Sequence, residues 1–565
     1  MDKKSWLSRL HYDFDKQRGN LELAYLQQEG PKSKWVKYLD AQADEKFLEV
    51  ANNRTILPNE IVIDIEEPEQ FQGILDRIKS NFEFFSAYST GSRGYHIHIF
   101  FDEPIDKENK KEIIEIYSGD KQKATERTMI ALENCPHWKT GKNKDLIEEV
   151  IGFNSISAIS KAISQNTINI TQDSFLRIKK ILRKYIDTSE ENYSLISLWI
   201  IGTYTHSVFS SYPYLFFNAM KGSGKSRTIK LIICLSHNGR LVMDLTDAVL
   251  FRTAKGSTLG IDEFENVVAK EKTTLRTLLN SAYKKGVKVA RMKKVKAKGQ
   301  ESMEVEEFEV YAPIVMANIN GMDNVLSDRC ITIIQERTTD DRINRLIEDF
   351  DNDKEIRAIK EQLSVNLVKL MQLVSSKNII SEWNDYVGFM CSPETAQTTL
   401  SSQITPEKIK IFEKIYCSDV KARHLELFFP IFVIASLIGE NLLDKTIETA
   451  KNIVFVKKSE DLVESRDVAL IEFISNMQQT LDFTSITELT RQFKDYMQEE
   501  DEQYHTITTK WVGRALKRLN LIIEKRRLGK GVEVIVNVSK AKEKIGLFKT
   551  NRPDEISNNS SNNTQ

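Results

Sequence analysis

The sequence predicts a multi-domain α/β protein. Its 565 residues are enough for three or four domains, and 41% hydrophobic with 28% charged residues is the composition of a globular protein. Short apolar runs typical of strands alternate with helical stretches in the first quarter of the chain and again in its middle. We therefore expect an α+β domain, a central α/β domain with a helical lid, and a C-terminal module of helices and strands.

These patterns divide the chain into six predicted segments. They are an α+β domain over 1–150, a helical linker over 151–205, the central α/β domain over 206–345, a helical region over 346–460, a C-terminal domain over 461–548 and a tail over 549–565. The tail is polar and low in complexity, which predicts disorder.

Charge and cysteine usage exclude several classes of protein. The net charge is −1, so any binding of nucleic acid must come from local basic patches. The five cysteines are far apart and form no CxxC pair, which argues against a zinc ribbon and suits a reducing compartment. The N-terminus lacks the apolar core of a signal peptide, and the longest apolar stretch, 427–438, is shorter than the about 20 residues of a membrane span. We expect a cytoplasmic protein without a membrane partner.

The strongest motif lies in the middle of the chain, where an apolar strand at 215–217 precedes a glycine-bearing loop and an amphipathic helix. Backbone N–H groups of such a loop face a phosphate, Lys225 can reach the outer phosphates, and the Ser226 hydroxyl can hold Mg²⁺. Ala219 stands where this motif usually has its first glycine. The predicted nucleotide-binding residues of the loop are Gly222, Ser223, Gly224, Lys225 and Ser226.

An acidic pair follows a later predicted strand. Asp262 is expected to hold Mg²⁺ through water, and Glu263 to polarise the water that attacks ATP. Asn318 ends another apolar strand and is expected to contact the γ-phosphate or this water. Arg329 can act as an arginine finger on a neighbouring subunit's nucleotide, with Arg291 as a rival and a plain ion pair as the alternative. This order of elements predicts an ATP-hydrolysing domain.

The same order of motifs resembles AAA+ ATPases and the superfamily 3 helicases of plasmids and viruses, and the flanking segments look like the DUF3631-type ATPases that accompany mobile-element primases. The resemblance covers about residues 190–440. It implies ATP-driven DNA translocation by a homo-oligomeric ring. Lysines before Gly299 and glutamates after it predict a hairpin with opposite charges across its strands. Superfamily 3 helicases grip DNA with a hairpin at this place, and a self-neutralised surface hairpin is the alternative.

Acidic and histidine residues on two predicted strands mark the N-terminal domain. In EIVIDIEE, three isoleucines face a core while Asp64 and Glu66 share the other side of the strand. Two adjacent carboxylates repel unless a cation lies between them, so they are candidate ligands of Mg²⁺ or Mn²⁺. In TGSRGYHIHIFF, His96 and His98 lie on one face of a strand, and a third acid, Asp120, follows.

These three motifs together resemble those of archaeo-eukaryotic primases, the primase-polymerase family, over about residues 15–150. The resemblance implies that Asp64, Glu66 and Asp120 bind two catalytic metal ions and that His96 contacts the incoming nucleotide, with Glu133 as a rival to Asp120. It implies metal-assisted transfer of a nucleotidyl group from a nucleoside triphosphate to a 3′-hydroxyl on a single-stranded DNA template, with pyrophosphate as the leaving group.

The C-terminal domain reads as three amphipathic helices followed by a strand, a glycine-containing turn and a strand, the pattern of a winged helix. Residues 506–531 carry eight basic residues and one acid, a local surplus typical of contact with duplex DNA phosphates. A winged helix that contacts only protein is the alternative. The expected DNA-binding residues are Lys510, Arg514, Lys517, Arg518, Arg526, Arg527 and Lys530.

The predicted fold class is therefore multi-domain α/β, with an N-terminal α+β primase-type domain, a central P-loop AAA+ domain with a helical lid and a C-terminal winged helix. The predicted function is DNA replication by a primase-polymerase joined to a helicase-type ATPase that uses ATP and Mg²⁺ or Mn²⁺. A replication initiator or loader with an inert primase-like domain is one alternative. An ATP-driven switch without DNA unwinding is another.

Overall fold

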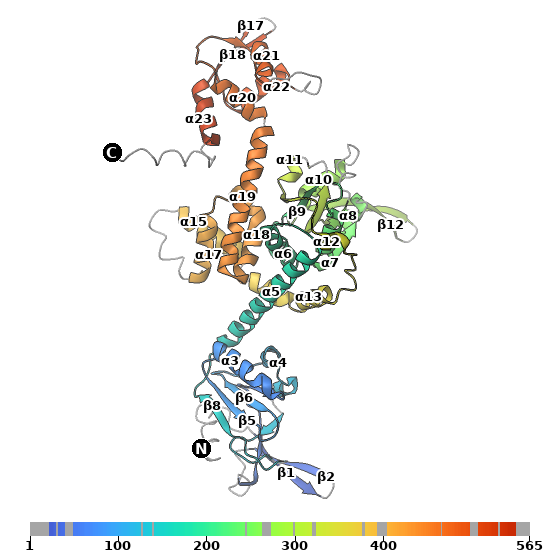
Figure 1. Ribbon diagram of the computed structural model, residues 1–565, viewed down its shortest axis with the longest axis vertical. Helices are drawn as coiled ribbons and strands as arrows, with labels where there is room; N and C mark the ends of the chain where they lie inside the picture. Colours follow the sequence, from blue (N-terminus) through green and yellow to red (C-terminus); the bar gives the residue numbers. More distant parts are fainter. Residues whose placement is uncertain are drawn as a thin grey trace, which may run out of the picture. The chain divides into compact units, whose positions relative to one another are not determined.

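The computed structural model describes most of the chain, which forms two compact units, residues 1–447 and 448–565 (Figure 1). The described residues are 22–29, 32–39, 49–125, 128–137, 140–242, 246–262, 273–297, 300–318, 322, 324–375, 379–391, 404–464, 466–497, 507–528 and 531–549. Within these ranges, no helix has the length and apolar character that a membrane span requires. All of the predicted tail except Lys549 lies outside them.

Two antiparallel four-stranded sheets form the N-terminal part of the first unit. The first has the order β2–β1–β3–β7, with β2 at Lys32–Leu39, β1 at Glu22–Glu29, β3 at Asn53–Thr55 and β7 at Met129–Ala131. The second has the order β4–β6–β5–β8, with β4 at Glu60–Ile65, β6 at Tyr95–Phe100, β5 at Phe85–Ser89 and β8 at Leu146–Val150.

Residues of the second sheet alternate between a core and a polar face. Ile61, Ile63 and Ile65 of β4 lie in a buried core with helices α3 (Phe71–Asn81) and α4 (Lys107–Ile116). Asp64 therefore points to the opposite face, because successive strand residues alternate sides. Pairing of Asp64 with His96 in the β4–β6 register brings the two predicted motifs into adjacent positions.

A helix of 29 residues, α5 (Ser157–Tyr185), leads out of this domain. Ile159 and Ala162 near its start belong to the core that α3 and α4 share, and its later turns pack against α6 (Glu190–Thr203) and α13 (Lys354–Val365). The predicted linker thus consists of helices that are packed into the unit along their length.

A five-stranded parallel sheet forms the centre of the first unit, with the order β10–β11–β14–β9–β15. Its strands are β10 at Gly239–Val242, β11 at Thr258–Ile261, β14 at Ile314–Asn318, β9 at Tyr214–Ala219 and β15 at Cys330–Gln335. Helices α7 (Lys225–Leu235), α8 (Asp247–Thr253) and α10 (Thr273–Ala282) accompany it. This parallel α/β arrangement agrees with the α/β fold predicted for the central domain.

A glycine sets the distance between the sheet and α7. A Cβ atom on Gly260 of β11 would stand 2.5 Å from the Ile233 side chain of α7, closer than atoms can approach. The bare backbone of β11 therefore allows the helix that follows the glycine loop to lie directly on the sheet.

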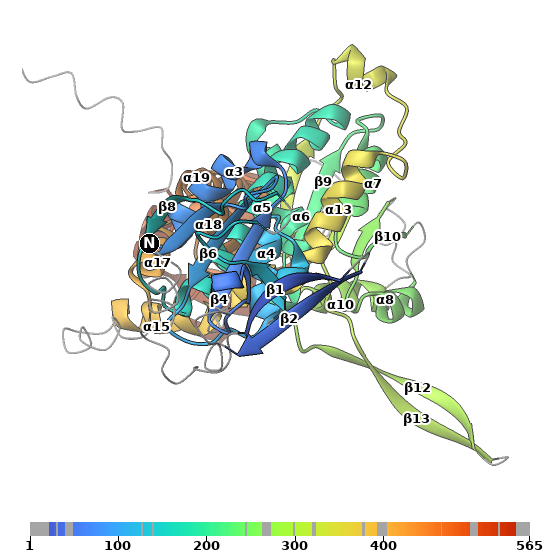
Figure 2. The same ribbon diagram turned by 90° about the horizontal axis from the view of Figure 1, so that it is seen from below.

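The predicted charged hairpin is present as β12 (Lys288–Ala297) and β13 (Gln300–Glu309), which Figure 2 shows extending together away from α8 and α10. Its register sets opposite charges across the strands, with Lys288 opposite Glu309 and Arg291 opposite Glu306. The prediction of a hairpin with opposite charges across its strands is thus confirmed.

Helices form much of the remaining described part of the first unit. They are α11 (Asn324–Ser327), α12 (Asp341–Arg345), α14 (Leu367–Ser375), α15 (Ile379–Cys391), α17 (Pro406–Tyr416) and α18 (Ala422–Ile438), and α19 (Glu440–Glu464) begins at its end. The apolar stretch found in the sequence is the buried part of α18, where residues 427–435 are enclosed by neighbouring helices.

The second unit has its own core and the predicted order of helices and strands. Its elements are α20 (Arg466–Ser475), β16 (Thr484–Ser485), α21 (Ile486–Tyr496), α22 (Thr509–Arg518), β17 (Ile522–Leu528), β18 (Gly531–Val536) and α23 (Val538–Lys549). The strands form an antiparallel sheet of order β16–β18–β17. Leu489, Val512 and Leu516 pack with Val534 in one core.

Candidate functional site

The glycine-bearing loop joins the buried strand β9 to the start of α7. Gly222 and Gly224 have φ angles of 80° and 82°, the left-handed region that glycine adopts without strain. The Ser223 N–H donates to the Met220 carbonyl at 3.2 Å, which closes the turn, and Thr228 N–H donates to the Gly224 carbonyl in the first turn of α7. The loop therefore ends at a helix N-terminus, where unpaired N–H groups and the helix dipole favour an anion. Lys225 and Ser226 are the first two residues of this helix.

Two further predicted residues lie at the same edge of the sheet as this loop. Asp262 follows the last residue of β11, and Asn318 ends β14 in register with Asn218 of β9. Strands of a parallel sheet present their carboxyl ends on one edge, which is where ligands of open α/β sheets bind. Because β14 lies between β11 and β9, the backbone of Asp262 is two strand spacings from β9, about 10 Å. Glu263 lies outside the described residues.

The side chains at this edge suit a magnesium ion bound together with a nucleotide. Asp262 is 8% exposed, and Ser226 offers a hydroxyl in the first turn of α7. Mg²⁺ prefers oxygen ligands and in nucleotide sites takes only one or two from the protein, with the phosphates and water supplying the others. The oxygen atoms of Ser226 and Asp262 are therefore suitable ligands for Mg²⁺.

Strand β15 and the residues that follow it add four hydrogen bonds to the loop and to the start of α7, which the sequence motifs did not indicate. Gln335, its last residue, donates from Nε2 to the Ser223 carbonyl at 3.0 Å and to the Thr228 hydroxyl at 2.8 Å. Arg337 donates from Nε and Nη2 to the Lys221 carbonyl at 2.9 and 2.6 Å. No motif contains these residues, and only the parallel pairing of β15 with β9 brings them to the loop.

Arg329 lies at the opposite edge of the same sheet. It precedes Cys330, the first residue of β15, and a strand of six residues separates it from the loop edge by about 20 Å. Its Nε donates to the Asn280 carbonyl at 2.8 Å, and its guanidinium lies 5.3 Å from the centre of the Tyr283 ring. Arg329 thus cannot reach the nucleotide of its own subunit. Arg291, its predicted rival, is opposite Glu306 in the hairpin.

A second group of predicted residues meets on the polar face of β4 and β6. The Asp64 carboxylate lies 3.4 Å from Nε2 of His96 and 3.1 Å from Nζ of Lys123. Burial raises the pKa of Asp64, but the contacts with His96 and Lys123 outweigh it and lower the pKa well below its usual value. Burial and the charge of Lys144 lower the pKa of His96 to about 4, so its imidazole is neutral at pH 7. Nδ1 of His96 is buried and has no hydrogen-bond partner among the residues that the structure describes.

The other two predicted acids, Asp120 and Glu66, lie near Asp64 but have different surroundings. Asp120 accepts a hydrogen bond from the Gln122 N–H at 3.0 Å and so begins the short helix η4 (Lys121–Ala124) that carries Lys123. Glu66 follows β4 and is exposed. Among the described residues, no three His, Cys, Asp or Glu side chains are close enough together to hold a metal ion. In this arrangement, the Lys123 ammonium is the cation beside Asp64.

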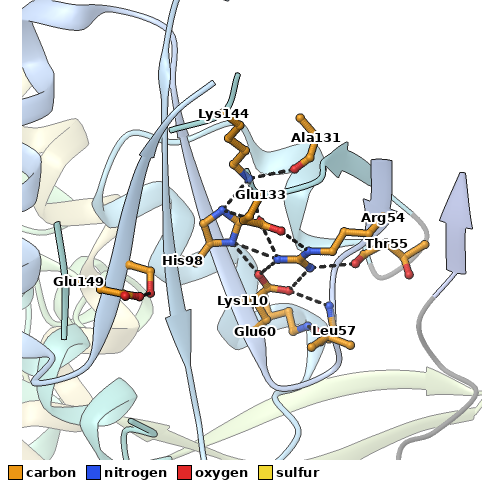
Figure 3. Close-up of polar contacts among 11 residues, drawn as sticks. Arg54, Thr55, Leu57, Glu60, His98, Lys110, Ala131, Glu133, Lys144 and Glu149 are labelled. Atoms are coloured by element: carbon orange, nitrogen blue, oxygen red, sulfur yellow. Dashed lines mark hydrogen bonds and ion pairs between the residues drawn. The ribbon is translucent and has the colours of Figure 1, made fainter. Parts of the chain in front are cut away.

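A buried ionic cluster, drawn in Figure 3, lies beside this group, since the rings of His96 and His98 are 5.8 Å apart. Arg54 of β3 donates to both oxygens of Glu60 at 2.7 and 2.8 Å and to both oxygens of Glu133 at 2.9 and 3.0 Å. Lys144 donates to Glu133 at 2.8 Å and contacts Nε2 of His98 at 3.0 Å. Nδ1 of His98 lies 2.7 Å from Glu60. An ammonium can only donate, so His98 accepts at Nε2 and donates from Nδ1 to Glu60.

All five residues of this cluster are at most 1% exposed. Burial raises the pKa of Glu133, but Arg54 and Lys144 outweigh it and lower the pKa to about 2. Burial, together with the charge of Lys144, lowers the pKa of His98, which matches the neutral tautomer. Glu133, the rival to Asp120, is thus a member of this cluster. The sequence did not indicate the cluster, because its members come from five separate segments.

The predicted DNA-binding residues of the second unit divide into two groups. Lys510, Arg514 and Lys517 of α22 are exposed. Arg518, at the end of this helix, is held by Asp467 through hydrogen bonds of 2.8 to 3.2 Å.

The strand pair β17–β18 shows the same division. Arg527 is exposed, whereas Arg526 pairs with Glu533 at 2.6 Å and lies 3.9 Å over the Phe483 ring. Lys530 lies outside the described residues. The basic surface available for a polyanion is therefore smaller than the sequence count of basic residues suggests.

Comparison with known proteins identifies no family for this chain. No protein-family model matches it, and no curated protein matches it. A solved structure titled "Structure of Drosophila ORC bound to DNA" is similar over 67% of this chain and 91% of its own, at 11% sequence identity and a TM-score of 0.17. A TM-score this low means that the two backbones do not superpose as wholes, so the likeness supports no argument about function.

Proposed function

We propose that the chain is an ATP-hydrolysing protein of DNA replication, in which the central domain drives movement on DNA. The observation that supports this most is the meeting of three parts at one sheet edge. The glycine loop before α7, Asp262 after β11 and Asn318 at the end of β14 are all at the carboxyl end of the parallel sheet.

In this proposal, each residue of the site has a separate role in ATP hydrolysis. The loop N–H groups and Lys225 bind and orient the phosphates, and Asn318 orients the γ-phosphate or the attacking water. Ser226 and Asp262 would hold Mg²⁺, which supplies charge neutralisation on the phosphates. Glu263 polarises the attacking water.

A ring of subunits would complete the site. Arg329 is directed away from its own nucleotide edge, which suits a residue that stabilises transition-state charge on the nucleotide of a neighbouring subunit. The hairpin β12–β13 and the exposed basic residues of α22 supply candidate DNA contacts. Assembly of this kind predicts that ATPase activity rises with protein concentration and with added DNA.

ATP hydrolysis by the full chain with and without DNA tests the proposal. Lys225→Ala is expected to lower kcat by about 100-fold or more, because the outer phosphates lose their main cation. Lys230→Ala is the matched control, since Lys230 lies on the same helix but pairs with Glu348 at 3.0 Å. Wild-type protein that neither binds nor cleaves ATP in the presence of DNA would disprove the proposal.

For the N-terminal domain, we propose primase-type nucleotidyl transfer with Asp64, Glu66, Asp120 and His96 as the site residues. The convergence of Asp64 and His96 from two strands, and of Asp120 from the adjacent turn, supports it. The described arrangement does not gather the acids into a metal-binding group, so a metal would have to displace Lys123 from Asp64. Incorporation of labelled nucleotides on single-stranded DNA, abolished by Asp64→Asn, is the expected result.

The contact between Lys123 and Asp64 also favours a second candidate function, an initiator or loader whose primase-like domain only grips DNA. A permanent ammonium beside the carboxylate would supply the charge that a metal otherwise provides. Lys123→Met distinguishes the two, because it removes the ammonium while keeping the length of the side chain. Incorporation by neither wild type nor Lys123→Met, together with DNA binding by both, would support the initiator.

A further inference from the structure

We propose that Arg337 is a positioning residue for ATP binding, which holds the glycine loop in its phosphate-accepting shape. This inference rests on the proposed ATPase function and extends it to a residue outside every motif of the sequence. Arg337 lies two residues beyond the end of β15, the strand that pairs with β9, and its side chain is exposed. Both of its hydrogen bonds go to a single acceptor, the Lys221 carbonyl in the middle of the loop.

Because peptide units are planar, this contact also determines the direction in which the N–H groups of the loop point. In a trans peptide, the C=O and the N–H of one unit point in opposite directions. Arg337 holds the Lys221 carbonyl toward β15, so the N–H of Gly222 points away from β15. Gln335 holds the Ser223 carbonyl toward the same strand, so the N–H of Gly224 also points away from it. Two alternate amides are thereby directed to one side of the loop, as binding of a phosphate requires.

The close approach of the Arg337 guanidinium to Gly222 indicates a specific contact. A Cβ atom on Gly222 would stand 3.3 Å from both Nε and Nη2 of Arg337, a distance tighter than most side-chain contacts. The glycine therefore provides both the positive φ of the turn and the room for the guanidinium. The chain after Arg337 is also anchored to α7, since Arg227 donates to the carbonyls of Ile343 and Leu346 at 2.9 Å.

This geometry predicts a specific kinetic result. Loss of the guanidinium leaves the reacting groups in place but allows the Lys221 peptide to rotate, so the amides must be ordered when ATP binds. Arg337→Ala is expected to raise the Kd and KM for ATP by about tenfold, equal to about 1.4 kcal/mol, with kcat changed by less than about twofold. Arg337→Lys is expected to recover part of the affinity, because an ammonium can still donate to the Lys221 carbonyl.

Arg342→Ala is the matched control. Arg342 is also exposed, follows the same strand, and also donates to backbone carbonyls, those of Arg183 and Lys184, at 3.1 and 3.4 Å. It does not contact the loop. The thermal midpoint of Arg337→Ala without nucleotide is expected to match that of wild type, while the increase produced by ATP and Mg²⁺ becomes smaller.

Titration of the full-length protein with a fluorescent ATP analogue, followed by steady-state ATPase kinetics, decides the matter. Wild-type affinity in Arg337→Ala, or a loss of kcat with unchanged KM, would overturn this inference while leaving the proposed ATPase intact. Equal weakening by Arg342→Ala would also overturn it, because the effect would then belong to the whole segment. If wild type itself binds no ATP, the proposed function fails first and this inference fails with it.

Discussion

Removal of Arg54 tests the ionic cluster of the N-terminal domain. Arg54→Met keeps the length and apolar stem of the side chain but deletes the charge that both Glu60 and Glu133 share. With His98 neutral, the native cluster balances Arg54 and Lys144 against these two glutamates. The variant leaves two buried carboxylates and one cation, and it leaves four hydrogen-bond acceptor contacts unmet.

The size of the effect follows from this imbalance. Breaking a buried ion pair by removing one partner costs about 3–5 kcal/mol, since the remaining charge stays buried without compensation. We expect Arg54→Met to reduce the stability of the two N-terminal sheets by this amount at pH 7. The double variant Arg54→Met/Glu133→Gln restores the charge balance and is expected to be more stable than Arg54→Met alone.

The pH dependence of the stability difference between Arg54→Met and wild type is a second, independent test. In wild type, the pKa of Glu133 is depressed to about 2, so its contribution to stability is present above the unfolded value of about 4.5 and is lost only as pH falls toward 2. In Arg54→Met, burial without the guanidinium raises the glutamate pKa values. Protonation then relieves the buried charge, so the stability difference between variant and wild type should narrow as pH falls from 7 to 5.

Hydrogen–deuterium exchange of peptides that cover β3, β4 and β6 is the suitable assay, because a chain of two units need not unfold in one step. Arg77→Met is the control, since Arg77 is an exposed arginine that donates to the Ile116 carbonyl and lies over the Tyr117 ring. A loss below about 1 kcal/mol in Arg54→Met, or a difference that is constant between pH 7 and 5, would refute the reasoning.

Three further predictions follow from the described contacts. Gly260→Val is expected to displace α7 from β11 and to lower the stability by about 1–3 kcal/mol, because the added Cβ overlaps an isoleucine of that helix. Thermal denaturation and ATP affinity measure the effect, and wild-type values of both would contradict this packing. Lys517→Ala should weaken duplex DNA binding and its salt dependence more than Arg518→Ala, because Asp467 already holds Arg518; equal losses would contradict this. The pKa of His96 is lowered to about 4, so as the pH falls the unfolded state binds a proton at this residue before the folded state does, and stability should decline between pH 6.5 and 4. Hydrogen-exchange rates in β6 of wild type and His96→Asn test this, and parallel pH profiles of the two proteins would contradict it.

Local patterns predicted much of the fold. Alternation in β4 identified its core face, and opposite charges around Gly299 identified the hairpin. The strand, glycine loop and helix around Lys225 formed where they were expected, because the φ angles and the helix start depend on residues close together in the chain. Asp262 and Asn318 were predicted at strand ends, and the parallel pairing of β14 with β11 and β9 places both at one edge of the sheet.

The sequence by itself determined which short segments become strands, helices and a phosphate-type loop, since propensity, side-chain periodicity and glycine conformation act over a few residues. Only the tertiary structure decided that Arg337 contacts the loop and that Glu133 joins Arg54 rather than the acids near Asp64. It also decided that Asp467 holds Arg518. Each of these pairings joins residues more than 50 positions apart, and a long-range contact depends on the packing of whole sheets and helices, which no local pattern encodes.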